Sequence, residues 1–407
     1  MKVDFLAEAA ASQDTLISLR RQLHRTAGTG FDIPETLSIV QKELEKLGLA
    51  FQNCGKAGLV ATITGKKPGK VFLLRADMDA LPIREESGED FASDNGCMHA
   101  CGHDMHTAML LTAAKLLKEH EDTLCGTVKL MFQPAEELLE GAKNMVESGV
   151  LNDPRPDAAM MVHVMTGTPF MPGTVVVSGP GESAPAADYF TINVQGIGCH
   201  GSSPNTGIDP LSAAAHIVTA LQEIPARELS MNDRAVLTLG TFHAGTTANV
   251  IPDTATLTGT LRAFDENLRA QLKERISVVS KGIAAAFRAT AEVTFDSGCP
   301  ALLNNKALSD DAARYMKELL GENMAFSVPE LEQKFGSTGS KTTGSEDFAY
   351  VSREVPSIMA ALAAGHPKDG YTYPLHHPQV RFDETALPFG AAAYAAMAYN
   401  WLLNHTD

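Results

Sequence analysis

Long apolar runs are missing from this sequence of 407 residues. The best candidate, residues 389–403, is rich in alanine, is interrupted by Asn400, and is shorter than the about 20 apolar residues that a helix needs to cross a bilayer. The N-terminal stretch carries Asp4 and Glu8 among its apolar residues, which is not typical of a secretory signal. The sequence therefore predicts neither a membrane-spanning chain nor an exported one.

Positive charge and patterned cysteine are also scarce. The 33 Lys and Arg against 49 Asp and Glu give a formal net charge of −16, which argues against nucleic acid and against a membrane surface as partners. The 6 cysteines show no paired spacing, so we expect reduced thiols and a cytoplasmic protein. Because the length exceeds the ~250–300 residues at which a single core stops growing, we expect more than one domain.

The most informative stretch is residues 95–107, NGCMHACGHDMHT, because it concentrates side chains that bind metals. Thiolates and imidazoles bind zinc and similar ions at neutral pH, and this stretch supplies Cys97, His99, Cys101, His103 and His106. A structural zinc knot would require a second pair of closely spaced ligands, but the remaining cysteines stand alone in the sequence: Cys54, Cys125, Cys199 and Cys299. The pattern therefore favours a catalytic metal site over a structural one.

Strand-like and helix-like runs alternate through the first part of the chain. The patterns predict two helices within residues 6–49, a helix after Asp104 as its N-cap, and strands at 59–64, 71–75, 127–132 and 158–164. This order indicates an α/β fold with a mixed, mostly parallel sheet and flanking helices. Reactive groups collect beyond the carboxyl ends of such strands, and the sequence places there Asp77, Asp79, Glu136, Glu137 and His163.

The pattern changes after about residue 185. A strand, a helix, two strands, a helix and a last strand follow one another, which is the ferredoxin-like α+β arrangement. We infer an inserted domain over residues 186–297. Residues 1–185 and 298–407 would then form one discontinuous metal-binding domain.

A hydrolytic metal site needs protein ligands, an open position for water and a base. Candidate ligands from several parts of the chain are Cys101, His103, Glu137, His163 and His376. Five ligands exceed one tetrahedral site but suit two metals about 3.5–4 Å apart that share a ligand. A thiolate is suited to bridge them, because it carries a full negative charge and several lone pairs.

The Glu136-Glu137 pair permits a division of labour. Neighbouring carboxylates in an extended backbone point in different directions, so one can bind metal while the other acts as general base. Such a pair alone would indicate a solvated loop, but this one follows an apolar strand and Pro134. Asp79 is expected to orient a ligand histidine, whereas the sequence leaves Asp77 open between that role and an ordinary loop residue. His99 and His106 are interpreted as structural or supporting groups, and His24 is left without a role.

Several motifs together carry a family resemblance. They are RADMDALP (75–82), MHACGHDMH (98–106), QPAEE (133–137), GSEDF (344–348), LHHP (375–378) and, in the inserted domain, NVIPDTATLTGTLR (249–262). With these motifs the chain resembles the hippurate hydrolase and indole-acetyl-amino-acid hydrolase group of the aminoacylase–carboxypeptidase superfamily. The resemblance spans essentially the whole sequence.

The resemblance implies a dinuclear site, a set of residue roles and a dimer. The implied metal ligands are Cys101, His103, Glu137, His163 and His376, with Glu136 as the base. His376 is favoured by position, and His377 is its rival. The inserted domain would mediate dimerisation and lend groups to the active site, with His200 stabilising the oxyanion and Asn249 and Arg262 binding substrate.

Two segments depart from the family pattern. Relatives usually read HPEL where this chain reads HRTAGTG (24–30), and often carry a GGHG-like turn where it reads GCHG (198–201). These departures affect the expected substrate preference and leave the expected metal chemistry unchanged.

The resulting expectation is hydrolysis of an N-acyl amino acid by two ions of Zn, Mn, Co or Ni in a homodimer or higher homo-oligomer. One alternative is a dipeptidase or carboxypeptidase of the same superfamily. The other is a non-catalytic metal-bearing binding protein, which predicts that the base or a ligand is lost. The sequence retains Glu136 and every expected ligand, which counts against this second alternative.

Overall fold

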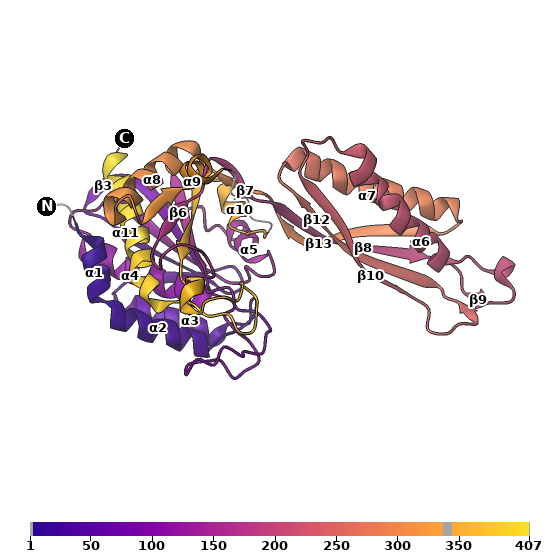
Figure 1. The fold of residues 1–407 in the computed structure, drawn as a ribbon, viewed down its shortest axis with the longest axis horizontal. Helices are drawn as coiled ribbons and strands as arrows, with labels where there is room; N and C mark the ends of the chain where they lie inside the picture. The colour runs from indigo at the N-terminus through magenta and orange to yellow at the C-terminus, as the bar shows by residue number, and fades with distance from the viewer. Residues whose placement is uncertain (1–2, 337–343, 407) are drawn as a thin grey trace. The chain divides into compact units, whose positions relative to one another are not determined.

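The computed structural model describes residues 3–336 and 344–406. The chain forms two compact units, one built on Ala184–Leu302 and the other on the preceding chain and most of the following chain. Both chain ends lie in the latter, hereafter the first unit (Figure 1).

The first unit contains a central sheet with the strand order β1-β2-β4-β3-β5-β16-β6-β15. Strands β3, β4, β5 and β16 run parallel, whereas β1, β2 and β6 introduce antiparallel pairs. The strands span β1 (Phe51–Cys54), β2 (Gly58–Thr64), β3 (Lys67–Asp77), β4 (Cys125–Gln133), β5 (Ala158–Met165), β6 (Val175–Val177), β15 (Ala325–Ser327) and β16 (Ser357–Ala363). The predicted mixed α/β sheet is confirmed, although the predicted strands did not include β1, β6, β15 and β16.

Helices flank this sheet. They are α1 (Phe5–Ala11), α2 (Gln13–Arg25), α3 (Pro34–Lys46), α4 (His103–Glu119), α5 (Gly141–Glu147), α8 (Lys306–Leu320), α9 (Val328–Phe335), α10 (Ala349–Ser352) and α11 (Leu387–Asn404). Helices α4 and α11 pack against each other and against β3. Both are apolar around most of their circumference, which is typical of a helix buried on several sides. Helix α4 is therefore a rigid base for the residues at its N-terminus.

Two predictions for the first unit are wrong in detail. The N-terminal segment holds three helices, because Ser12 separates α1 from α2. The Ser12 hydroxyl donates to the carbonyl oxygen of Glu8 at 3.4 Å, a local bond of the kind that competes with helix continuation. Asp104 is not the N-cap of α4, because the helix begins at His103 after Gly102, whose φ of 84° only glycine adopts readily.

The second unit has the ferredoxin-like order that the sequence predicts. Its elements are β8 (Ala186–Gln195), α6 (Pro210–Leu221), β10 (Ala235–Ala244), β12 (Thr254–Ala263), α7 (Glu266–Ala286) and β13 (Thr290–Cys299). The sheet is antiparallel with the order β10-β12-β8-β13, and α6 and α7 cover one of its faces (Figure 1). Phe190, Ile217, Leu257 and Ile276 lie in the core between sheet and helices.

The remaining elements are short. Strand β9 (Cys199–His200) pairs with β11 (Val250–Ile251), and β7 (Gly181–Ala184) pairs with β14 (Leu302–Asn304). Short helical turns lie at Pro204–Thr206, Ile224–Glu228, Pro367–Asp369 and Glu384–Ala386. Across residues 3–336 and 344–406, none of the helices has the length and apolarity that a membrane crossing requires.

Candidate metal centre

The candidate site lies at the carboxyl ends of β3, β4 and β5. Parallel pairing sets Asp77 at the end of β3 opposite Gln133 at the end of β4. His163 lies near the end of the neighbouring strand β5. The side chains that follow these strands therefore meet at one edge of the sheet, as the sequence predicts for a parallel arrangement.

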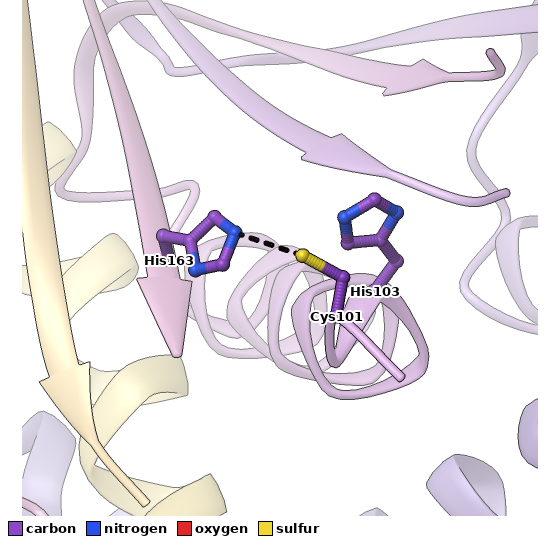
Figure 2. A group of neighbouring side chains, drawn as sticks. All are labelled: Cys101, His103 and His163. Atoms are coloured by element: carbon purple, nitrogen blue, oxygen red, sulfur yellow. Dashed lines mark hydrogen bonds between the residues drawn. The ribbon is translucent and has the colours of Figure 1, made fainter. Parts of the chain in front are cut away.

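Cys101, His103 and His163 form the first group of ligand atoms. Cys101 precedes α4, His103 is its first residue, and His163 is on β5, yet their ligand atoms lie within 4.8 Å of one another. Figure 2 shows the thiol of Cys101 directed at the ring of His163, with 3.5 Å between Sγ and Nε2. Burial raises the pKa of the Cys101 thiol, but His163 and His103 outweigh it and bring the pKa down to about 6. The group therefore favours a thiolate at neutral pH.

Cys101 also belongs to a second group, with Glu137 and His376. His376 Nε2 lies 3.4 Å from Glu137 Oε1, and His103 Nε2 lies 3.9 Å from the same oxygen. The acceptor atoms and negative charges of Cys101 and Glu137 beside the His376 ring raise the pKa of His376 to about 10. One thiol thus lies between two sets of metal-binding atoms.

Hydrogen bonds to backbone carbonyls fix which ring nitrogen the candidate ligands His103 and His163 offer. Nδ1 of His103 lies 2.8 Å from the carbonyl oxygen of Asp79, and Nδ1 of His163 lies 2.8 Å from that of Val164. A carbonyl can only accept, so each Nδ1 carries a hydrogen, and in the neutral ring each Nε2 then keeps its lone pair. Both lone pairs belong to the Cys101 group, which is the arrangement that a metal ion requires.

Two buried atoms in the site lack an ordinary partner. His103 Nε2 and Glu137 Oε1 make no hydrogen bond among the residues that the structure describes. Buried polar atoms are nearly always satisfied, so two such atoms 3.9 Å apart require an explanation. The donor set of thiolate, imidazole and carboxylate fits borderline divalent ions. These residues therefore fit a metal centre.

Asp79 holds the turn that presents the glutamate pair. Its buried carboxylate accepts the backbone N–H of Glu136 at 2.9 Å and that of Glu137 at 3.2 Å. The backbone of Ala135, just before them, has a φ of 55°, so the chain turns sharply after β4. Asp79 therefore fixes both the turn and, through its own carbonyl, the ring of His103.

His376 and His377 differ clearly in their surroundings. Nδ1 of His377 accepts the backbone N–H of Gln379 at 3.1 Å, and its ring stacks on Tyr373 with 4.4 Å between centroids. His376 instead faces Glu137, with a φ of 66° that is unusual for a residue other than glycine. Such backbone strain is often found at functional sites, and it turns the His376 side chain toward the cluster.

Asp77 and His106 form a hydrogen-bonded support next to the candidate ligands. Asp77 accepts from Arg75 Nη1 at 2.7 Å and lies 2.6 Å from Nδ1 of His106. His106 Nε2 accepts the backbone N–H of Val164 at 2.8 Å. Both ring nitrogens of His106 are therefore engaged, so His106 ties α4 to β3 and β5. Although Asp77, His103 and His106 lie close enough together to hold an ion, these bonds already use the Asp77 and His106 atoms.

Asp347 of the GSEDF motif contacts Arg75, which also binds Asp77. Asp347 accepts from Arg75 Nη2 at 3.0 Å, from the Gln133 side-chain amide at 2.7 Å and from the backbone N–H of Ala142 at 2.8 Å. Three motifs that are far apart in the sequence therefore converge on one buried carboxylate.

A buried ionic network behind α4 was not expected. Arg20 and His24 both lie 2.7 Å from the carboxylate of Asp104, and His24 lies 3.0 Å from that of Glu85. Asp104, which was predicted to cap α4, is instead the central carboxylate of this network. The sequence signal was a charged pair, Arg20 and His24, spaced four residues apart on an otherwise apolar helix face.

The expected substrate and oxyanion residues all lie in the second unit. His200 ends β9, Asn249 precedes β11, and Arg262 is on β12 with its guanidinium 5.3 Å from the centre of the Tyr189 ring. The antiparallel pairing of His200 with Val250 brings the first two segments together.

Comparison with known proteins identifies the family. Residues 73–400 match the model of peptidase family M20/M25/M40. The chain belongs to this family.

Two relatives and one solved structure illustrate the match. The N-acetyl-L-cysteine deacetylase of Bacillus subtilis (strain 168) is 37% identical over 91% of this chain and 84% of its own. The IAA-amino acid hydrolase ILR1-like 2 of Arabidopsis thaliana is 36% identical over 96% and 85%. The crystal structure of the Bacillus subtilis YXEP protein, a dinuclear metal binding peptidase from the M20 family, matches with a TM-score of 0.78 and 32% identity over 97% of this chain and 99% of that one. The resemblance that the motifs carry is confirmed.

Proposed function

We propose that this M20 chain hydrolyses the amide bond of N-acyl amino acids, releasing a carboxylic acid and a free amino acid. The observation that carries the proposal is the thiol of Cys101, which belongs both to the group with His103 and His163 and to the group with Glu137 and His376. A thiolate with neighbours on two sides is suited to bridge two ions. The deacetylase and hydrolase relatives support the substrate class.

The ions would be held by Cys101, His103, Glu137, His163 and His376. When bound, two divalent cations polarise the amide carbonyl and make a water molecule easier to deprotonate. Thiolate and imidazole ligands favour Zn, Co or Ni, and the carboxylate of Glu137 also suits Mn.

Glu136 is the proposed base. It accepts the proton of the attacking water at a carboxylate oxygen and returns it to the nitrogen of the leaving amine. Its side chain is 6% exposed, so little solvent competes for the proton, and Asp79 holds its backbone N–H at 2.9 Å. For the second unit we propose that His200 donates a hydrogen bond to the developing oxyanion and that Asn249 and Arg262 bind the substrate.

We also propose that the second unit mediates a homodimer and that the protein is cytoplasmic. Strand β10 is at the edge of its sheet, and Val236 and Phe242 on it are 58% and 41% exposed. An exposed edge strand with apolar side chains is suited to pairing with another chain. Every cysteine lies in the described part of the chain and is free, as suits a reducing compartment. Sedimentation analysis of the purified protein measures the oligomeric state.

The function is tested by amine release from a panel of N-acetyl, N-benzoyl, N-arylacetyl and N-fatty-acyl amino acids together with dipeptides. The chain is stripped of metal and reloaded separately with Zn, Mn, Co or Ni. We expect metal-dependent turnover of at least one acyl class. Turnover confined to dipeptides with a free α-amine would indicate a dipeptidase, and silence across the panel with two ions bound per chain would overturn the proposal.

A further inference from the structure

The imidazole of His200 is held by the residue two positions further along the chain. The backbone N–H of Ser202 donates to Nδ1 of His200 at 3.1 Å, and the Ser202 hydroxyl lies 2.8 Å from the same nitrogen. A backbone N–H can only donate, so Nδ1 must accept and cannot carry a hydrogen. The hydrogen of the neutral ring is therefore on Nε2, and the Ser202 hydroxyl is a second donor to Nδ1.

The backbone around His200 is anchored on both sides. His200 pairs with Val250 across the β9–β11 ladder, and the N–H of Gly201 donates to the carbonyl oxygen of Asn249 at 2.8 Å. Three residues further along the chain, the backbone N–H of Ser203 donates to the carbonyl oxygen of His200 at 2.8 Å. Hydrogen bonds within residues 200–203 therefore hold both the backbone and the imidazole of His200, although the His200 side chain is exposed.

We propose that Ser202 is a positioning residue for hydrolysis because it holds His200 in the tautomer whose Nε2–H is a hydrogen-bond donor. This inference rests on the proposed role of His200 as donor to the oxyanion. The opposite tautomer presents a lone pair at Nε2, which repels a negatively charged oxygen. Selecting the tautomer before substrate binds removes a rearrangement from the reaction, as is general for preorganised donors.

The tautomer itself is measured without any turnover. Full-length, metal-loaded protein is labelled with ¹⁵N-histidine, and His200→Gln identifies the ring signals of His200. We expect a protonated Nε2 and an unprotonated Nδ1 in the wild type. In Ser202→Ala one of the two donors to Nδ1 is lost, so the fraction of the Nδ1–H form should rise. A wild-type ring protonated at Nδ1, or a Ser202→Ala spectrum identical to that of the wild type, overturns the proposal.

Kinetics then test whether the tautomer matters. Ser202→Ala should lower kcat about 3- to 10-fold with little change in KM, which is the effect of one hydrogen bond. Ser202→Thr keeps the hydroxyl and should restore the rate, and the matched control Ser203→Ala should leave it unchanged. In a His200→Ala background, Ser202→Ala should cost nothing more.

These experiments distinguish failure of the positioning role of Ser202 from failure of the proposed role of His200. A further loss from Ser202→Ala in the His200→Ala background means that Ser202 acts through the loop and overturns the positioning role. A His200→Ala variant with an undiminished kcat overturns the proposed function of His200, and the catalytic role of Ser202 with it, whatever the tautomer measurement shows.

Discussion

Replacing Glu136 by Gln should separate proton transfer from metal binding. Gln has nearly the same volume and keeps the backbone N–H that donates to Asp79 at 2.9 Å, so the turn stays in place. It cannot accept a proton from water at neutral pH. Because a positioned general base contributes typically about 10²–10⁴-fold to a rate, kcat for the preferred N-acyl amino acid should fall by that factor.

Glu137→Gln is the matched change one residue further on. Glu137 Oε1 lies 3.4 Å from His376 Nε2 and has no hydrogen-bond partner in the described chain, so it is placed to bind an ion. An amide oxygen is a weaker ligand than a carboxylate, and we expect metal affinity to fall by more than the about 10- to 100-fold typical of outer partners.

The assay for both variants is metal content per chain after gel filtration, together with steady-state amine release. Glu136→Gln should keep the full metal content and lose turnover, whereas Glu137→Gln should lose both. The carboxylate of Glu136 also lies within 4.8 Å of ligand atoms of His103 and Glu137. Reduced metal content in Glu136→Gln would therefore make Glu136 a ligand, and a rate near that of the wild type would refute its role as base.

Three further predictions concern the residues around the site. His376→Ala should lower metal content, whereas His377→Ala should keep it, because His376 faces Glu137 and His377 stacks on Tyr373. Metal analysis of the two variants tests this, and equal losses would contradict the distinction. Asp104→Asn should lower the free energy of unfolding by about 3–5 kcal/mol, as is typical when one partner of a buried ion pair is removed, and urea denaturation measures this value. Burial lowers the pKa of His24, but its carboxylate neighbours outweigh burial and raise the pKa above its ordinary value. The stability that His24 contributes is therefore present below pH about 6.5 and is lost as the pH rises through the folded-state pKa. Denaturation of the wild type and of His24→Gln at pH 6 and pH 9 should show a smaller pH dependence in the variant, and an equal pH dependence would contradict the assignment.

Much of the fold was predictable because hydrophobic periodicity reports local structure. The strands that became β2, β4 and β5 are apolar runs bounded by turn residues, and their alternation with helices indicated the α/β sheet. The two errors are of another kind. The break at Ser12 depends on one side chain bonding to its own backbone, and the start of α4 depends on the φ of Gly102. Neither changes the hydrophobic pattern, so periodicity could not report them.

The candidate ligands were proposed from side-chain chemistry, and their mutual proximity came from the fold. The sequence left Asp77 open between orienting a ligand histidine and being an ordinary loop residue, and it favoured His376 with His377 as its rival. The structure adds contacts that bear on both: Asp77 is engaged by Arg75 and His106, and His377 is engaged by Gln379 and by the ring of Tyr373. His106 is distant from Asp77 in the sequence, and the contacts of Arg75 and of Gln379 depend on side-chain and backbone geometry that apolar periodicity does not report.

The sequence by itself determined which donor atoms this protein owns and in what order, because thiol, imidazole and carboxylate chemistry belongs to the residue and not to its surroundings. It also determined the strand and helix order, because the spacing of apolar residues is written along the chain. Only the tertiary structure decided which donor atoms lie close together, which ring nitrogen His103 and His163 present, and which carboxylates are already hydrogen-bonded. These depend on the register of β3, β4 and β5 and on single hydrogen bonds such as that between His103 and the carbonyl of Asp79, which form only when distant segments pack together.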